Sequence, residues 1–256
     1  MTSFAARSEA RSALPWIAAG AGLVAGTALA VGGYHYAAMY PGSRLFGRAL
    51  VAGTDPSEIA LTYDDGPNEP YTGQLLDLLA RYQVRATFFS IGRYARQKPH
   101  VLRLVHEAGH LIGSHTMTHP ALMYMGPKKI RAEIQEGTSI LEDIIGEKVR
   151  YFRPPFGARS PLVFRAAEEL HLTPVLWNVS ASDWTAIPAT EIEERLRRGI
   201  ERNRRKGRAS NVLLHDGGHR EMGTDRRRTV TATANLLAGA ANSAYRLITL
   251  DAWSAG

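Results

Sequence analysis

The chain has 256 residues, of which 45% are hydrophobic and 21% are charged, and it carries a formal net charge of +7 without any cysteine. This length and composition fit one globular α/β domain with an appendage. Because cysteine is absent, disulfides, iron–sulfur clusters and thiolate metal sites are excluded, and any bound metal must take nitrogen and oxygen ligands.

The first predicted element is a long uncharged stretch near the N-terminus. No Lys, Arg, Asp or Glu occurs between Arg11 and Arg44, and this span exceeds the roughly 20 residues with which a helix crosses a bilayer. Arg7 and Arg11 precede the stretch, so the positive-inside rule places the N-terminus in the cytoplasm and the remaining chain outside it. We therefore assign residues 1–11 to a cytoplasmic N-terminus, 12–36 to a transmembrane anchor or signal segment, 37–57 to a linker and 58–256 to the main domain.

Two alternatives for this stretch stay open. The sequence Ala28-Leu29-Ala30 fits a signal-peptidase site, in which case the main domain is secreted after cleavage. The many Gly and Ala residues insert into membranes only marginally, so the second alternative is a soluble Ala-rich helix.

From residue 58 onward, short apolar runs alternate with amphipathic stretches at helical spacing. The apolar runs predict strands at Ile59–Tyr63, Ala86–Ile91, Leu111–Ser114, Val149–Phe152, Pro174–Val179, Asn211–Leu214 and Arg246–Leu250. The stretches between them predict helices at Thr72–Tyr82, Ala95–Ala108, Pro127–Ile145, Ser160–Leu170, Ala189–Arg204 and Asp225–Ala240. About seven strands that alternate with helices predict a parallel sheet, closed here into a distorted (β/α) barrel.

Two pairs of side chains that can bind a metal follow strands of this pattern. Asp64 and Asp65 come directly after the first strand, where adjacent like charges are costly unless a cation receives them. His115 and His119 follow the third strand, and two imidazoles at this spacing converge on one point when the segment forms a helical turn. One carboxylate with two histidines is a usual ligand set of a catalytic zinc that keeps an open position, which leaves the other carboxylate to act as a general base. The pattern therefore predicts a metal-dependent hydrolase.

Each motif taken singly has a simpler interpretation. An Asp-Asp-Gly-Pro tetrapeptide is commonly a solvated turn, and a His-x-x-x-His pair occurs by chance on surface helices. The conjunction favours the metal site, because both motifs end apolar runs and both lead into turn residues.

Further polar side chains follow later strands, on the face of a barrel where such folds carry their chemistry. Arg153 precedes two prolines on a rigid turn, where its guanidinium could bind Asp64 bidentately. His215 ends an apolar run, and Asp183 could hydrogen-bond its ring and raise its pKa, which makes an acid that works near neutral pH. Apolar walls for a small group such as a methyl come from Trp184 and Leu213. The histidines that lack comparable context, and that we interpret as structural or exposed, are His106, His110, His171 and His219.

The positive charge is concentrated in two segments of the chain. They contain Arg195, Arg197, Arg198, Arg202, Arg204, Arg205, Lys206 and Arg208, and then Arg226, Arg227 and Arg228. No aromatic residues are interleaved with them for base stacking, so we predict no nucleic-acid partner. A solvated helix face and attraction to anionic lipid or wall polymer stay open as meanings. The sequence indicates no obligate protein partner.

Taken together, the motifs resemble those of the polysaccharide deacetylase family, the chitin and peptidoglycan deacetylases of carbohydrate esterase family 4. The resemblance covers the chain from about Glu58 to Trp253. It rests on motifs in one order, Thr62-Tyr63-Asp64-Asp65-Gly66, His115-Thr116-Met117-Thr118-His119, Arg153-Pro154-Pro155-Phe156-Gly157, Ser180-Ala181-Ser182-Asp183-Trp184 and Leu213-Leu214-His215. The chain departs from the family where Tyr63 replaces the usual Phe and where Ser180 replaces the first aspartate of Asp-x-x-Asp-Trp.

The resemblance implies a distorted (β/α) barrel and a divalent metal bound by Asp65, His115 and His119. Zinc is the usual metal of the family, and cobalt or nickel also suit histidine and carboxylate ligands. The resemblance further makes Asp64 the general base and gives Arg153 the role of steadying it.

The resemblance also makes His215 the general acid, paired with Asp183, and lets the backbone N–H of Phe156 stabilise the oxyanion. The implied reaction is hydrolysis of the acetamide on an N-acetylated glycan of the cell envelope, such as peptidoglycan, a chitin-like polymer or an exported polysaccharide. With the predicted orientation of the N-terminus, the catalytic domain lies in the periplasm or outside the cell. The alternatives are an O-acetyl esterase, a catalytically inactive glycan-binding module and a membrane protein with a structural metal.

Overall fold

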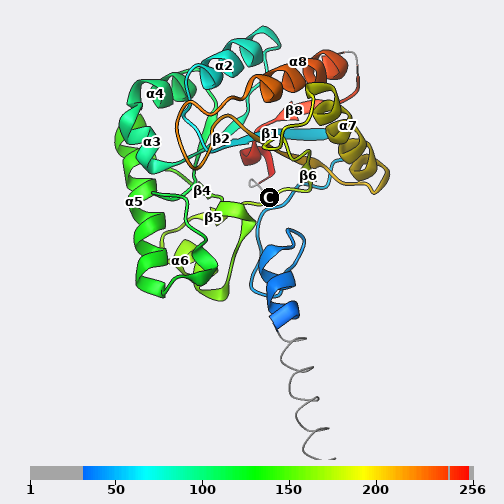
Figure 1. The fold of residues 1–256 in the computed structure, drawn as a ribbon. Helices are drawn as coiled ribbons and strands as arrows, with labels where there is room; N and C mark the ends of the chain where they lie inside the picture. The colour runs from blue at the N-terminus through cyan, green and yellow to red at the C-terminus, as the bar shows by residue number, and fades with distance from the viewer. Residues whose placement is uncertain (1–30, 242, 254–256) are drawn as a thin grey trace, which may run out of the picture.

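The computed structural model describes residues 31–241 and 243–253, in which helices surround a curled parallel sheet (Figure 1). The strands are β1 (Glu58–Asp64), β2 (Thr87–Ser90), β3 (Leu111–Ser114), β4 (Tyr151–Phe152), β5 (Thr173–Pro174), β6 (Val179–Ser180), β7 (Ser210–His215) and β8 (Arg246–Ile248). The α-helices are α2 (Tyr71–Arg81), α3 (Gly92–Gln97), α4 (Pro99–Glu107), α5 (Pro127–Ile145), α6 (Pro161–Glu169), α7 (Ala189–Arg205) and α8 (Arg227–Ala241). Short 3-10 turns occur at η1 (Leu122–Tyr124), η2 (Pro155–Gly157) and η3 (Leu250–Trp253).

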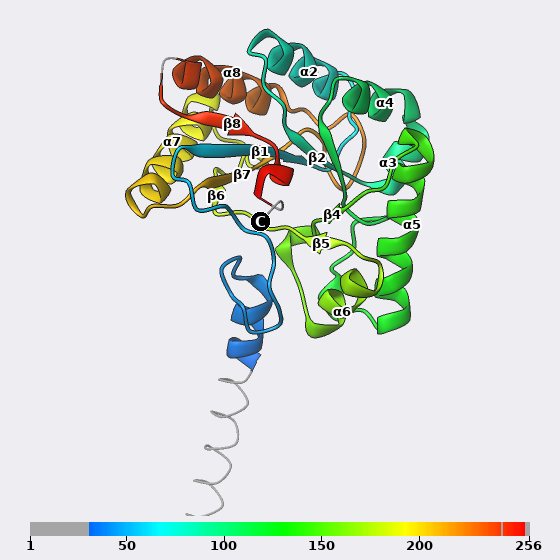
Figure 2. The same cartoon turned by 180° about the vertical axis from the view of Figure 1, so that it is seen from behind.

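The strand order explains how the sheet curls into a distorted barrel. The order is β5-β4-β3-β2-β1-β7-β6, with every pair parallel, and β8 pairs with the first residues of β1 (Figure 2). The two outer strands, β5 and β6, belong to one stretch of chain, so the four residues between them join the ends of the sheet. The prediction of a single strand at Pro174–Val179 is therefore wrong. The chain has to pass from the edge of β4 to the edge of β7, and it cannot pair with both in one register.

The predicted helix Ala95–Ala108 is divided into α3 and α4 at Lys98. Lys98 has φ −128° and ψ 55°, outside the helical region, and Pro99 follows it. Proline lacks an N–H donor and disfavours the helical conformation of the residue before it, so a helix ends there and a new one begins with proline in its first turn.

Alternation along β1 decides which side chains reach the functional site. Ile59, Leu61 and Tyr63 pack outward in the main core beneath the helices. Ala60 faces the other way and belongs to a smaller cluster with Phe89, Tyr151, Val175 and Leu250. Because successive strand residues point to opposite faces, Thr62 and Asp64 lie on the inner face with Ala60. The inner face of β1 therefore becomes polar towards its carboxyl end.

The segment before β1 packs against the barrel. Residues 31–39 are helical, and Leu50 forms a parallel bridge with Val175, between β5 and β6. The guanidinium of Arg159, which is buried, donates hydrogen bonds to the backbone carbonyls of Gly157 (2.9 Å), Ala37 (3.3 Å) and Tyr40. In the described part of the chain, no helix has the length and apolarity needed to cross a membrane. Most of the predicted anchor 12–36 lies outside the described residues.

Candidate metal centre and active site

Three potential metal ligands meet at the carboxyl ends of β1 and β3. Asp65 follows β1 in a left-handed conformation (φ 74°), and its N–H donates to the carbonyl of Phe89 in β2 (3.2 Å). Its Oδ1 lies 3.5 Å from His115 Nε2 and 3.3 Å from His119 Nε2. One ligand atom from each of the three buried residues lies within 4.8 Å of the other two. The structure thus brings together the three side chains named as metal ligands by the resemblance.

The two histidines converge without the helical turn that the spacing suggested, so that expectation is wrong. The segment after β3 bends through Thr116 (φ 67°) and His119 (φ 63°), and the His119 N–H donates to Thr116 Oγ1 (3.0 Å). Helix α5 presses on this bend at Gly137, where an added Cβ would lie 2.4 Å from the carbonyl carbon of Thr116. Packing between distant segments therefore sets the loop conformation.

The protonation of the histidines suits metal binding. The backbone carbonyl of Arg153 can only accept, so the 2.8 Å contact with His115 Nδ1 fixes the proton there and leaves the Nε2 lone pair facing Asp65. Burial lowers the pKa of His115 to about 4 and that of His119 to about 3. Burial raises the pKa of Asp65, but the nearby imidazoles, led by His219, lower it by more. At neutral pH the set is one carboxylate with two neutral imidazoles.

One unsatisfied atom of the set also fits a cation. Asp65 Oδ1 is buried and has no hydrogen-bond partner among the described residues. An orphaned carboxylate oxygen between two imidazole lone pairs is costly by itself, and a divalent ion would satisfy all three groups. The residues present therefore fit a metal with nitrogen and oxygen ligands.

Asp64 lies beside this set but has different partners. Its Oδ1 accepts a hydrogen bond from Arg153 Nη1 (2.7 Å), and its Oδ2 lies 3.8 Å from His115 Nε2. Burial raises the pKa of Asp64, while Arg153 and then His215 act in the opposite direction. The expected bidentate contact is not formed, because Nη1 alone reaches Asp64 and also donates to Thr62 (2.8 Å). The Arg153 guanidinium is fully buried, with its centre 4.1 Å from the centroid of the Phe89 ring.

His215 and Asp183 form the second polar pair of the site. In the pairing of β1 with β7, Asp64 lies opposite His215. The His215 ring Nδ1 is 2.8 Å from Asp183 Oδ1, and the His215 backbone N–H donates to Asp183 Oδ2 (2.9 Å). Burial lowers the pKa of His215, but Asp183 outweighs this and the pKa rises to about 9. Thr229 also donates to Asp183 Oδ2 (2.8 Å), whereas the exposed Ser180 accepts from the Ser182 N–H (3.4 Å).

The two aspartates and three of the histidines described above line one cleft of about 590 Å³, namely Asp64, Asp65, His115, His119 and His215. Leu213 and Trp184, the two predicted apolar walls, line it together with the ring of Phe156. The Trp184 side chain is 51% exposed, and its ring meets the His215 ring edge-on at a centroid distance of 5.2 Å. Phe156 adopts a left-handed conformation (φ 59°) and places its ring 4.6 Å from that of His119.

One site residue was missed by the sequence interpretation, which treated His219 as structural or exposed. The His219 ring stacks on the His119 ring at 4.6 Å, and its Nδ1 lies 3.8 Å from Asp65 Oδ2. Its backbone carbonyl accepts hydrogen bonds from Arg93 and from the Tyr94 hydroxyl (3.1 Å). The available signal was its position in the loop after β7, at the face where the other polar residues collect. His110, in contrast, is structural, since its Nδ1 accepts from the Ala86 N–H (3.1 Å).

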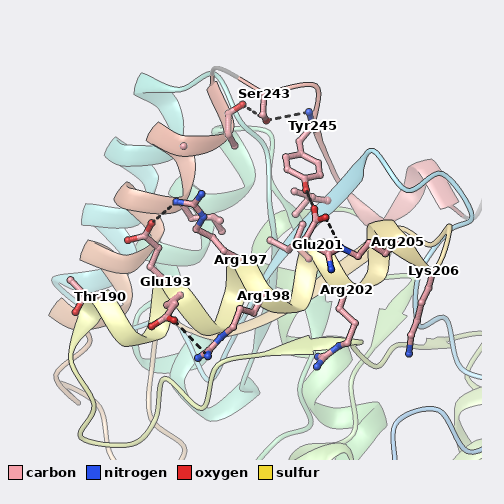
Figure 3. A pocket seen from close by; sticks show the side chains of 16 residues that line it. Thr190, Glu193, Arg197, Arg198, Glu201, Arg202, Arg205, Lys206, Ser243 and Tyr245 are labelled. Carbon is pink, nitrogen blue, oxygen red and sulfur yellow. Dashed lines mark hydrogen bonds and ion pairs between the residues drawn. The ribbon is translucent and has the colours of Figure 1, made fainter.

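A larger cavity of about 1070 Å³ lies away from these residues, along α7 and beside the end of α8 (Figure 3). Its basic side chains, Arg197, Arg198, Arg202, Arg205 and Lys206, are most of the first basic segment. Arg197 pairs with Glu193 (3.6 Å), Arg198 with Glu194 (3.6 Å) and Arg205 with Glu201 (2.9 Å). Such exposed pairs along one helix indicate a solvated face in which much of the positive charge is balanced locally.

The fold and the site define a (β/α)-barrel protein with an Asp–His–His set at the carboxyl ends of its strands. The sequence model of the polysaccharide deacetylase family matches residues 52–175. A peptidoglycan-N-acetylglucosamine deacetylase of Bacillus cereus is 37% identical over 195 residues, which are 75% of this chain and 86% of that protein. The chain therefore belongs to the polysaccharide deacetylase family, as the motifs predicted.

Other relatives support the same assignment. A chitooligosaccharide deacetylase of Azorhizobium caulinodans is 36% identical over 174 residues, covering 68% of this chain and 80% of that protein. The crystal structure of a peptidoglycan N-acetylglucosamine deacetylase matches with a TM-score of 0.70 and 28% identity, over 80% of this chain and 91% of that chain.

Proposed function

We propose that the protein is a metal-dependent hydrolase that removes N-acetyl groups from an amino-sugar polysaccharide of the cell envelope. Membership of the family and the activities named for the relatives support the reaction class. The observation that carries the proposal is the different surroundings of two adjacent carboxylates. Asp65 faces two imidazole nitrogens, whereas Asp64 is held by a guanidinium and keeps one oxygen near the metal set.

Asp65, His115 and His119 would hold the metal, with zinc as the first candidate and cobalt or nickel as alternatives. When bound, such an ion supplies a Lewis acid that polarises a carbonyl oxygen and makes water more acidic. The two aspartates have different partners, so metal binding by Asp65 is separate from proton transfer by Asp64.

In the proposed reaction, Asp64 accepts the proton of the attacking water. It must be ionised to do so, and Arg153 favours the ionised form against the effect of burial. The backbone N–H of Phe156 donates to the acetyl oxygen as negative charge develops there. His215, protonated at neutral pH because of Asp183, donates a proton to the amine nitrogen as the C–N bond breaks. The products are acetate and a free amino sugar.

The division of labour between the aspartates is the point to test. Asp64→Asn should abolish acetate release from chitotetraose while the protein keeps one equivalent of zinc after dialysis. Asp65→Asn should lose the zinc. Loss of zinc from Asp64→Asn would contradict the proposal.

The class of bond can be tested with the same protein. Acetate release from acetylated xylan but not from chitotetraose would favour an O-acetyl esterase. Binding of either glycan without acetate release, in zinc-loaded protein, would favour an inactive glycan-binding module.

We also propose that the domain acts outside the cytoplasm, held by residues 12–36 or released after cleavage near Ala30. This rests on the uncharged stretch between Arg11 and Arg44. Fractionation of cells followed by N-terminal sequencing of the mature protein distinguishes an anchor from a signal, and full-length protein in the cytoplasm would refute both.

A further inference from the structure

A third buried carboxyl group, besides those of Asp64 and Asp65, lies next to the metal set. Asp216 directly follows His215, and only 1% of its surface is exposed. It is not among the residues that line the cleft. Its carboxyl group packs on Gly66 instead, where an added Cβ would lie 2.1 Å from Asp216 Oδ2. The proposed reaction gives this buried acid no task.

Hydrogen bonds connect Asp216 to the start of helix α2. Its Oδ2 accepts from Thr72 Oγ1 (2.6 Å), and the same hydroxyl accepts from the Asn68 N–H (2.8 Å). The Asn68 side-chain nitrogen donates to the carbonyls of Asp216 and Thr224, both at 2.9 Å. Its Oδ1 accepts from the Gly223 N–H (2.7 Å). These buried side chains therefore join the turn after β1 to the loop after β7.

The turn that is held in this way contains Asp65 in an unfavourable backbone conformation. Its φ of 74° lies in the left-handed region, which costs free energy in a residue with a Cβ and persists only where neighbouring groups enforce it. The N–H groups of Asp216 and Gly217 both donate to the carbonyl of Asp64, at 3.1 and 3.3 Å. An added Cβ at Gly217 would lie 2.0 Å from the carbonyl oxygen of Asp65. The first residues after β7 therefore fix the backbone that carries Asp65.

The contacts of Asp216 are not those of a side chain that serves stability alone. Its Oδ1 is buried and has no hydrogen-bond partner among the described residues. A buried carboxyl group with an unmatched oxygen costs free energy. Local arrangements that reduce stability in this way are concentrated at functional sites in native proteins. The place of Asp216 against the metal turn indicates which function it serves.

We propose that Asp216 is a positioning residue for the metal centre, which holds the turn after β1 so that the Asp65 carboxylate faces the two imidazoles. It acts on the backbone of this turn through its packing on Gly66, and Thr72 in turn holds the Asp216 carboxyl group. Removal of an outer group that orients a metal ligand typically weakens metal binding 10–100-fold. This inference rests on the proposed function, in which Asp65 is a ligand of the metal.

The test measures metal binding by the purified full chain. Zinc affinity is determined by competition with a chelating dye, and the visible absorption spectrum of the cobalt-loaded protein reports the geometry around the metal. Asp216→Ala should weaken zinc binding about tenfold or more and change the cobalt spectrum. Thr72→Val removes the hydroxyl that holds Asp216 and should change both readouts in the same direction. Thr72→Ser keeps the hydroxyl and should resemble the wild type in both.

Asn203→Ala is the matched control for the loss of a buried hydrogen bond. Asn203 is 7% exposed and donates to Ser210 Oγ (3.2 Å), at the opposite end of β7 from His215. This variant should lower the melting temperature and leave zinc affinity and the cobalt spectrum unchanged.

Three outcomes would count against these expectations. If Asp216→Ala lowers the melting temperature but keeps the wild-type zinc affinity and cobalt spectrum, Asp216 is a structural residue and the inference is overturned. If Asp216→Ala does not fold, the Thr72 variants decide, and equal readouts in Thr72→Val and Thr72→Ser would overturn the inference. Failure of the wild type to bind either zinc or cobalt would instead refute the metal site of the proposed function.

Discussion

Replacing Asp183 by Asn tests the acid of the proposed reaction. Asp183 raises the pKa of His215 to about 9 from an ordinary value of 6.5, against the opposing effect of burial. His215 must be protonated to act as an acid, so the rate falls as pH rises through its pKa. In Asp183→Asn the negative charge is lost, and the alkaline limb of the pH–rate profile should move down towards pH 6.5 or below.

The size of the effect follows from the two pKa values. At pH 8 about nine-tenths of His215 is protonated with a pKa near 9, but only about 3% with a pKa near 6.5, which predicts a rate about 30-fold lower. At pH 6 the same change predicts a loss of less than about twofold from protonation alone. The assay is acetate release from chitotetraose between pH 5 and 10 at saturating zinc.

Two observations would decide this prediction. Ser180→Ala is the control, because Ser180 is exposed and its hydroxyl accepts a hydrogen bond from the Ser182 N–H, and its profile should match that of the wild type. An alkaline limb that stays in place in Asp183→Asn, in protein with an unchanged melting temperature, would refute the role given to this pair.

Other predictions follow from the same contacts. Arg153→Gln removes the ion pair that lowers the pKa of Asp64, so the acid limb of the rate profile should move to higher pH; an unmoved acid limb would count against Asp64 as the base. Gly137→Ala should lower the free energy of unfolding by about 1–3 kcal/mol, measured by urea denaturation, because its Cβ meets the backbone of the metal loop. Gly239→Ala in α8, where an added Cβ meets no atom within 4 Å, is the control and should not lower this free energy. His219→Ala should weaken zinc binding about tenfold in calorimetry, since its ring supports Asp65 and His119; unchanged affinity would leave His219 a wall of the cleft. Arg159→Met should lower the melting temperature and expose residues 37–40 to proteolysis, and equal protease resistance would contradict the docking role of Arg159.

Much of the fold could be predicted because the hydrophobic pattern of most segments agrees with the strand or helix that they form in the folded protein. The predicted strand at Ile59–Tyr63 and the predicted helix at Pro127–Ile145 match β1 and α5 closely. The division of the stretch Pro174–Val179 could not be predicted, because nothing in its mostly apolar sequence shows that its two ends pair with different strands. The division into β5 and β6 is set by the strands with which they pair, β4 and β7, and these lie in other parts of the sequence.

The candidate site could likewise be predicted from the sequence only in part. Asp64, Asp65 and His115 follow directly from strands, so their meeting at one face could be predicted from the order of elements. The bend that brings in His119 could not, since it depends on the approach of α5. His219 lies in a loop without periodicity, and its contacts with His119 and Tyr94, which come from other segments, give it its position.

The clamp that Arg159 forms on residues 37–40 has a mechanical consequence. The same guanidinium also holds the carbonyl of Gly157, next to the turn that carries Phe156. Residues 37–40 are thus joined to the rim of the cleft through a single buried side chain. A displacement of residues 37–40 would therefore be transmitted through Arg159 to the turn that carries Phe156, so a change in this segment would also alter the rim of the cleft.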